Sequence, residues 1–253
     1  MTKEDILNHA STPLWASPIP TTEHIFRNRD HMYILYKTDP DALRIAVPEP
    51  LELPEEPLVR FEMMRMPDTT GYGDYTECGL AIPVLFNGQM GEYLHMMYLD
   101  NFEATASGRE AHGYPKKPGH PRYFLDDNTL VGTLDYGRSE PLRVATATMT
   151  YKYYPLTKEQ AMAQLTEPIY MLNMIPGYDD KPRVCELNVV RNKPENIRLI
   201  EAWAGNARLQ MFDHVNCPMN DLPVREIVSC SHIIADMKLS APEVIYDYLG
   251  EGN

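Results

Sequence analysis

Two adjacent lysines, Lys116 and Lys117, lie between prolines in the segment "GYPKKPG" (residues 113–119). A lysine pair in a turn is most often a solvated surface feature. The functional alternative is that one amine attacks a carbonyl carbon, which it can do only when it is unprotonated. An ordinary lysine has a pKa of about 10.4 and is almost entirely charged at neutral pH. The pKa of a reacting amine would have to fall by about four, which corresponds to about 5 kcal/mol.

Two physical effects could lower the pKa of such an amine. A second ammonium about 6–9 Å away contributes roughly 2–3 kcal/mol at an effective dielectric constant of about 20. Adjacent side chains of an extended segment point to opposite sides, which favours the longer distance. Desolvation in an apolar pocket alone can lower a lysine pKa by up to about 3–5. We therefore expect burial of one lysine to dominate, while the rigid, proline-flanked backbone holds the other lysine facing away.

A lysine that forms a Schiff base with a 3-oxo acid needs further charged groups around it. A cation must attract the substrate carboxylate, and acids must transfer protons during imine formation. The candidates are Arg29 in "FRNRD", Glu62 in "VRFEMM" and Glu77 in "YTECGLAIPV". Taken singly, such residues are more often surface or ion-pair residues. The two glutamates, however, interrupt apolar runs, where a carboxylate is costly without a partner or a role.

Several common functional motifs are absent from the sequence. It contains no GxSxG, HExxH, GxxxxGK[ST] or EF-hand pattern. We interpret "GYGD" (residues 71–74) as a turn, because it lacks the full dinucleotide-binding fingerprint. No two histidines have the i, i+4 spacing of a helical metal site, and we interpret His95 as a core or pocket residue. The sequence therefore predicts no metal site.

Composition restricts the partners and the compartment. The net charge of -13 argues against a nucleic-acid surface and requires a local cation for any carboxylate substrate. The N-terminus has no apolar signal region, and the longest apolar stretch, "LAIPVLF", is too short to span a membrane. The four cysteines have no regular spacing, which favours free thiols in a reducing compartment. We therefore expect a cytoplasmic protein without membrane contact. The cysteines are Cys78, Cys185, Cys217 and Cys230.

The remaining patterns predict one mainly β domain over residues 1–253, an antiparallel sandwich or barrel with a few short helices. Helices are expected at residues 4–10, 39–47 and 157–168, the last with a capping box formed by Thr157 and Gln160. A hairpin is expected at Asn87-Gly88. Strands are expected in ten segments rich in β-branched, aromatic and methionine residues. These segments are residues 31–36, 58–66, 79–86, 92–100, 129–136, 142–154, 183–190, 197–204, 207–212 and 226–239.

Many long segments, in order along the whole chain, resemble the acetoacetate decarboxylase family. The segments include "FRNRD", "VPEPLE", "EPLVRFE", "YTECGLAIPV", "NGQMGEYLHMMYLDN", "GREAHGYPKKPG", "NTLVGTLDYG", "RVATATM", "RLQMFDH" and "NDLPVREIVSCSHIIAD". The resemblance implies an antiparallel, β-barrel-like sheet with peripheral helices. It also implies a large homo-oligomer that needs no metal or organic cofactor. The implied reaction converts acetoacetate, a small 3-oxo acid, to acetone and CO2 through a lysine Schiff base and an enamine.

The resemblance also assigns roles to individual residues. Lys116 would be the Schiff-base lysine, and Lys117 the neighbour whose charge helps to lower the pKa of the reacting amine. Three residues fall at the polar catalytic positions of the family: Arg29, which would also bind the substrate, Glu62 and Glu77. Tyr114 and Met97 would line the apolar substrate pocket. Glu77 would assist proton transfer, and Glu62 would position Arg29 or the carboxylate.

Two other functions remain open from the sequence. Relatives of the family can use the Schiff-base lysine for aldol condensation and dehydration. Alternatively, the chain could be a non-catalytic β-barrel that binds a small apolar ligand and leaves its lysines solvated. The joint presence of Arg29, Glu62 and Glu77 with Lys116 favours the decarboxylase.

Overall fold

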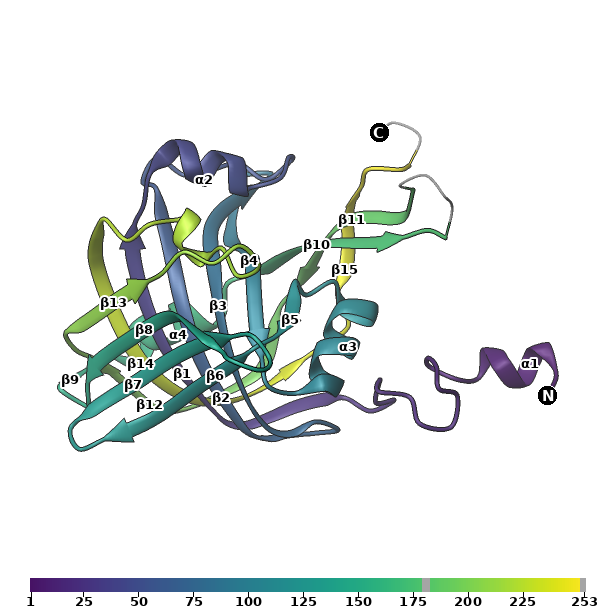
Figure 1. Cartoon of the computed structure of the whole chain (residues 1–253), viewed down its shortest axis with the longest axis horizontal. Helices are drawn as coiled ribbons and strands as arrows, with labels where there is room; N and C mark the ends of the chain where they lie inside the picture. The colour runs from purple at the N-terminus through teal and green to yellow at the C-terminus, as the bar shows by residue number, and fades with distance from the viewer. Residues whose placement is uncertain (179–182, 251–253) are drawn as a thin grey trace.

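The computed structural model describes residues 1–178 and 183–250, whose strands form two sheets (Figure 1). The large sheet has eleven strands, and the second sheet has four. In spatial order, the large sheet contains β15 (Glu243–Asp247), β11 (Val184–Asn192), β10 (Ile169–Pro176), β4 (Gln89–Leu99), β3 (Gly73–Phe86), β2 (Leu58–Thr69), β1 (His24–Lys37), β14 (Glu226–Leu239), β12 (Pro194–Ala204) and β9 (Tyr154–Pro155), with β5 (Lys116–Pro118) beside β4. The second sheet contains β13 (Ala207–Met211), β8 (Leu142–Thr150), β7 (Thr129–Tyr136) and β6 (His120–Asp126).

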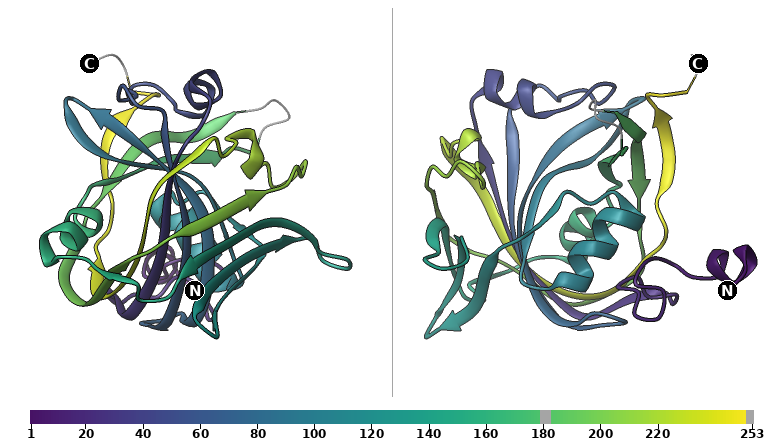
Figure 2. Two further views of the ribbon diagram at one scale, coloured as in Figure 1. Left: turned by 90° about the vertical axis from the view of Figure 1, so that its left-hand side faces the viewer. Right: turned by 45° about the vertical axis from the view of Figure 1, so that its right-hand side comes forward.

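The large sheet curls around helix α3 (Phe102–His112), so that β15 lies on the far side of the helix from β2 and β3 (Figure 2). Side chains alternate between the two faces of each strand, which gives the large sheet two separate cores. On β1, Met32 and Ile34 pack into the core shared with the second sheet and helix α2 (Pro40–Ala46). Tyr33, between them, packs into the core on the concave face, with α3 and helix α4 (Lys158–Leu165).

Two β-bulges change which side chains reach the concave face. On β4, Leu94 pairs with Ala81 and Met96 pairs with Leu80, so His95 is the extra residue. Because of this extra residue, Leu94 and Met97 both belong to the concave-face core. A comparable shift on β1 lies between Phe26 and Arg29, and it brings both of these side chains to the concave face.

The bulge on β1 is held by a contact from a neighbouring strand. Asn28 adopts a left-handed conformation with φ of 51°. Its backbone N–H donates to Asp236 Oδ1 on β14 at 2.8 Å, and Asp236 also accepts from Arg198 on β12. Three strands therefore fix the backbone that precedes Arg29.

The expected mainly β, largely antiparallel fold is confirmed, and each of the ten predicted segments coincides with a strand. The predicted hairpin joins β3 to β4, with positive φ at Asn87 and Gly88. Two details differ from the expectation. The large sheet is curled but runs between two ends, β15 and β9, and two of its pairings, β4 with β5 and β4 with β10, are parallel. Strands β5, β6, β10 and β15 were not predicted.

The three predicted helices are confirmed in shortened form as α1 (Lys3–Leu7), α2 and α4, and α4 begins with the predicted capping box. Helix α3 was missed. Its buried residues are Ala104, Thr105, Ser107 and Gly108, which are small or polar and give no apolar periodicity. The same small residues let α3 approach the sheet closely.

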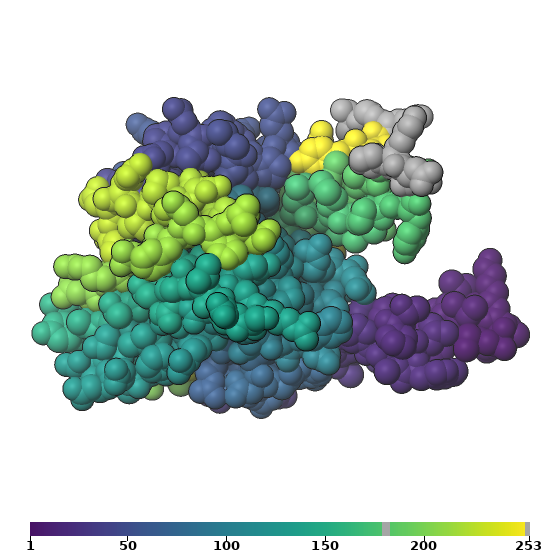
Figure 3. Space-filling model, in the orientation of Figure 1, coloured from purple at the N-terminus to yellow at the C-terminus, as the bar shows by residue number. Residues whose placement is uncertain are grey.

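The N-terminal segment stands out from the rest of the molecule (Figure 3). Helix α1 has no buried residue, and the side chain of Trp15 is 82% exposed. Within residues 1–178 and 183–250, the helices are too short or too polar to cross a bilayer.

Candidate active site

A pocket opens on the concave face of the large sheet, with an empty volume of about 870 Å³, part of it open to solvent. Its walls come from strands β1 to β5, β10, β12 and β14 and from helices α3 and α4. The pocket brings together all six residues that the sequence predicted for catalysis or substrate binding. They are Arg29, Glu62, Glu77, Met97, Tyr114 and Lys116.

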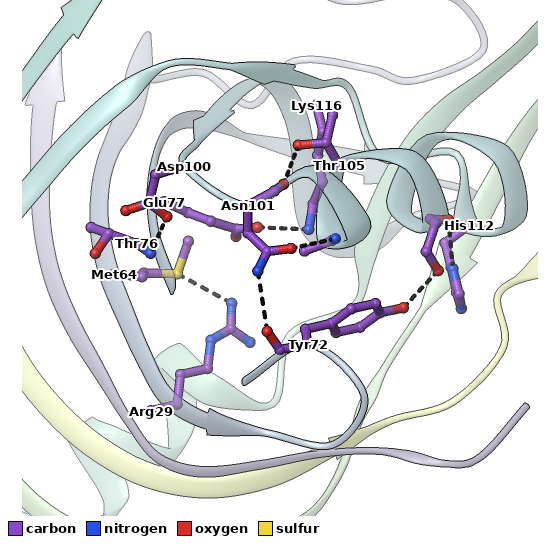
Figure 4. Close-up of polar contacts among 12 residues, drawn as sticks. Arg29, Met64, Tyr72, Thr76, Glu77, Asp100, Asn101, Thr105, His112 and Lys116 are labelled. Carbon is purple, nitrogen blue, oxygen red and sulfur yellow. Dashed lines mark hydrogen bonds and ion pairs between the residues drawn. The ribbon is translucent and has the colours of Figure 1, made fainter. Parts of the chain in front are cut away.

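Lys116 and Glu77 form a buried ion pair in this pocket. Lys116 Nζ lies 2.6 Å from Glu77 Oε1, and the residues are 7% and 2% exposed (Figure 4). The ammonium also lies 5.2 Å from the ring centre of Tyr114 and 5.9 Å from that of Tyr75. Burial is the main reason that the pKa of each of these two phenols is raised, so both remain neutral donors near pH 7. The amine of Lys116 therefore contacts the carboxylate of Glu77 and lies near the aromatic rings of Tyr114 and Tyr75.

Lys117 points to the opposite side of β5, as the sequence predicted. Its Nζ donates to the carbonyl oxygen of Asn216 at 2.7 Å. It also lies 5.2 Å from the ring centre of Tyr136 and 5.9 Å from that of Tyr98. Lys117 therefore lies outside the pocket, separated from Lys116 by the backbone of β5.

Helix α3 fixes the position of Lys116. Arg109 Nη1 donates to the carbonyl oxygen of Lys116 at 3.0 Å. The helix ends at Gly113 in the left-handed conformation with φ of 75°, which turns the chain back toward β4. The side chain of Lys116 then lies against Gly108, where an added Cβ would come within 2.6 Å of Lys116 Cδ. Glycine is therefore required in this helix because the lysine side chain occupies the space of a Cβ.

Arg29 is a half-buried cation that contacts two sulfur atoms and lies over the ring of Phe26, with 5.0 Å between the guanidinium carbon and the ring centre. Nη2 lies 3.2 Å from Met64 Sδ (Figure 4). Nη1 lies 3.3 Å from Met237 Sδ. Burial acts to lower the pKa of this guanidinium, but Tyr33 and Glu77 raise it overall, so the group stays charged. Among the described residues, no acid forms an ion pair with Arg29, whose Nε also lacks a partner. The group is therefore suited to bind an incoming anion.

Glu62 has a different partner from the one expected. Arg60 Nε donates to Glu62 Oε1 at 2.9 Å, and Arg60 Nη2 lies 2.7 Å from the same oxygen. Arg60 Nη2 also contacts Glu92 Oε2. Of the two expected roles of Glu62, positioning Arg29 or positioning the substrate carboxylate, the first has no direct contact behind it in the described structure, because Arg60 lies two residues away on the same face of β2 and pairs with Oε1. The second stays a prediction.

Sequence reasoning missed several pocket residues. Arg60 and Glu92 could have been found, because each places a charge within an apolar strand, as Glu62 does. Three histidines also line the pocket, and no sequence pattern indicated them. They are His24, His31 and His112. Burial is the main cause that lowers the pKa of each, which keeps them neutral near pH 7. His95, in contrast, lies outside the pocket lining, and the described residues contain no cluster of potential metal ligands.

Comparisons with known proteins agree on one family. The sequence model of the acetoacetate decarboxylase family matches residues 11–249. The chain is 57% identical over 249 residues to an acetoacetate decarboxylase of Clostridium botulinum, covering 98% of this chain and 99% of the relative. A solved structure of an acetoacetate decarboxylase superposes with a TM-score of 0.94 at 55% identity, covering 99% of this chain and 100% of the other. The crystal structure of the Legionella pneumophila acetoacetate decarboxylase gives 0.90 at 36% identity, with coverages of 97% and 96%.

Replacing Gly108 by alanine should separate stability from reactivity. Alanine favours a helix interior by about 1 kcal/mol over glycine, so α3 should not be weakened. The new Cβ would nevertheless displace Lys116 from Glu77, and a displacement of about 1 Å can slow a reaction about 100-fold. We expect at least a tenfold slower labelling of Lys116 by a small ketone with borohydride, measured by peptide mass spectrometry. Glu110→Ala, on the exposed side of α3, is the control, and equal labelling of both variants would contradict the packing argument.

The stability of the protein should depend on pH through His31. This residue is fully buried, and burial, followed by Arg29 and Arg60, lowers its pKa well below 6.5. The unfolded chain therefore binds more protons at mildly acidic pH, so the contribution of His31 is complete above about pH 6.5 and is lost as the pH falls. Between about pH 7.5 and 5.5, His31→Leu should lose less free energy of unfolding than the wild type, as measured by urea denaturation. Parallel pH profiles would show that His31 does not contribute.

Proposed function

The chain belongs to the acetoacetate decarboxylase family, and we propose that it converts acetoacetate to acetone and CO2 through a Schiff base on Lys116. One observation carries this proposal: Lys116 is buried 2.6 Å from the carboxylate of Glu77, in the pocket that also contains Arg29, a cation without an acid partner among the described residues. A buried amine with a proton acceptor beside it suits attack on a ketone, and the free cation suits a carboxylate.

The reaction begins with binding and proton transfer. The carboxylate of acetoacetate approaches Arg29, whose Nη atoms exchange their two sulfur contacts for it. Lys116 passes a proton to Glu77 Oε1, and its free electron pair then attacks the ketone carbon. Glu77 returns this proton to the former ketone oxygen, which gives the carbinolamine. Glu77 then takes a second proton from the nitrogen and passes it to the hydroxyl group, which leaves as water. The product is a protonated imine between Nζ and the former ketone carbon.

The protonated imine is the electron sink for the loss of CO2. The bond between the carboxylate carbon and its neighbour breaks, and its electron pair moves into a new carbon–carbon double bond while the nitrogen becomes neutral. The result is CO2 and an enamine. The apolar surface of Met97 and the aromatic rings of Tyr114 and Tyr75 favour this step, because charge is lost in it.

The enamine must next receive a proton on the carbon that lost CO2. Glu62 is an acidic side chain in the pocket that does not pair with Lys116. It shares the guanidinium of Arg60 with Glu92, so one of the two acids can hold a proton, and Glu62 is suited to pass it to the carbon directly or through water. Water then adds to the renewed imine, acetone leaves, and Lys116 recovers its pairing with Glu77. No metal or organic cofactor is needed to balance these steps.

The alternatives from the sequence are less well supported. The family match and the 57% identity over the full chain favour decarboxylation over aldol condensation and dehydration. A binding protein with solvated lysines is not supported, because Lys116 is buried and paired with Glu77.

Three further expectations remain part of the proposal. We propose one domain over the whole chain, a cytoplasmic location and a large homo-oligomer. The four cysteines form no disulfide in the described part of the chain, which fits a reducing compartment. The projecting N-terminal segment, with the exposed Trp15, offers apolar surface for contact between copies.

The proposed mechanism can be tested at Lys116 itself. Wild-type protein should release CO2 and acetone from acetoacetate in equal amounts, and Lys116→Arg should release neither above background, because a guanidinium remains protonated and cannot form the imine. Lys158→Arg, at the exposed start of α4, is the matched control and should behave as wild type. Release of CO2 by Lys116→Arg would refute the assigned mechanism.

The proposed role of Arg29 in binding the substrate carboxylate can be tested in the same way. Removing its charge in Arg29→Gln should weaken carboxylate binding by about 1.5–3 kcal/mol, which corresponds to a roughly ten- to hundredfold increase in KM. Arg27→Gln is the control, since Arg27 is exposed and pairs with the exposed Asp68. Steady-state kinetics of CO2 release measure both effects. An unchanged KM in Arg29→Gln would exclude carboxylate binding by this residue.

A further inference from the structure

Arg60, Glu62 and Glu92 form a buried ionic network in one wall of the pocket. The three residues are only 9%, 4% and 5% exposed. Arg60 contacts both carboxylates, with Nε and Nη2 on Glu62 and Nη2 on Glu92. Its guanidinium also lies over the ring of Tyr33, with 4.3 Å between the guanidinium carbon and the ring centre. The cation is thus held by contacts to two acids and one aromatic ring.

Such a network is a poor way to stabilise a core. Each charge that leaves water loses several kcal/mol of solvation, and well-packed apolar residues are often as stabilising as a buried ion pair. Here two acids share one guanidinium, which compensates the charge of only one of them, so the other can hold a proton. The neighbouring positions on the same face, Leu94 and Met64, are apolar. Retaining three ionisable groups at this place therefore suggests a role in the pocket rather than in folding.

The sheet geometry explains how the three residues meet. Arg60 and Glu62 are two residues apart and lie on the same face of β2. Glu92 lies on β4, one strand beyond β3. The residue of β3 opposite Arg60 is Ala81, whose small side chain lets the guanidinium reach across to β4.

The sheet register also places Glu62 and Lys116 in one row of backbone partners. Both contacts from Arg60 go to Oε1 of Glu62, and Oε2 is engaged by no contact in the described structure. Glu62, Gly79, Met97 and Lys116 are consecutive partners in one row across β2, β3, β4 and β5. Three strand spacings separate the backbones of Glu62 and Lys116, roughly 14 Å. Gly79 adds no side chain to this row, and the side chain of Met97 occupies the space beside it, with Cγ 3.4 Å from where a Cβ of Gly79 would lie. The two long side chains can therefore approach a small substrate from opposite ends of this apolar surface.

We infer that Arg60 and Glu92 are positioning residues that hold the carboxyl group of Glu62 toward the substrate carbon for the proton transfer that follows CO2 loss. This inference rests on the proposed function. Glu92 fixes Arg60, and Arg60 fixes Oε1 of Glu62, which leaves Oε2 to face the enamine carbon. In this step, Glu62 as a neutral carboxyl group gives the proton on Oε2 to carbon, the enamine electron pair forms the new C–H bond, and the nitrogen becomes an iminium again. Glu62 is left as a carboxylate and takes a new proton from water before the next turnover.

The test is Glu92→Gln, which keeps the shape of the side chain and removes its charge. We expect kcat for CO2 release to fall about ten- to hundredfold, because a proton donor displaced by about 1 Å loses much of its effect. KM should change little, since Arg29 is untouched. Borohydride should still trap a substrate adduct on Lys116, since imine formation does not use Glu92.

A double-mutant cycle separates positioning from a merely structural role. If Glu92 acts through Glu62, Glu92→Gln should lower kcat no further in a Glu62→Gln background. Asp74→Asn is the matched control, because Asp74 forms a comparable pair with Arg65 on the exposed ends of β2 and β3. This variant should keep the wild-type kcat. Arg60→Lys, which keeps the charge but loses the fork of donors, repeats the test if Glu92→Gln does not fold.

Two results would overturn the inference: a wild-type kcat in Glu92→Gln, or effects of Glu62→Gln and Glu92→Gln that multiply independently. Failure of the proposed function would look different. In that case the wild-type protein itself would form no adduct on Lys116 and release no CO2, whatever residue stands at position 92.

Discussion

The buried contact between Lys116 and Glu77 is the interaction on which the rest of the pocket depends. Removing an ammonium and a carboxylate from water costs several kcal/mol for each, and only close contact between them offsets this cost. Their separation of 2.6 Å meets that condition. The same closeness gives the amine a proton acceptor within hydrogen-bond reach, so one contact both makes burial tolerable and prepares the nucleophile. Arg29, which has no such acid partner among the described residues, is left to attract the substrate.

The surrounding fold can be understood as the set of elements that holds this contact in place. The bulges of β1 and β4 turn Arg29 and Met97 to the concave face, which strict alternation would not do. Helix α3 supplies a side-chain-free position at Gly108 for the lysine stem, and the curled sheet surrounds the helix (Figure 2). The short strand β5 sends Lys116 into the pocket and Lys117 to the outside, where Asn216 binds it.

Much of this arrangement could be predicted from the sequence, for identifiable reasons. The hairpin at Asn87-Gly88 and the apolar strands follow from local turn chemistry and residue type, and the opposite orientations of the two lysines follow from an extended backbone. Helix α3 was missed because its buried side is small and polar. The contact of Arg60 with Glu92 was missed because it crosses β3 and leaves no spacing in the sequence, although each of the two residues places a charge within an apolar strand. The bulge at His95 has no local sequence signal, so the inward orientation of Met97 rested on resemblance alone.

The most direct test of the account is to find where the substrate becomes attached. The protein is mixed with acetoacetate, reduced with borohydride and digested, and the modified lysine is identified by mass spectrometry. The account predicts one isopropyl-sized addition on Lys116, present only with substrate, because reduction fixes the imine of acetone on the buried amine. An unmodified Lys116, or additions scattered over exposed lysines, would contradict the Schiff-base mechanism.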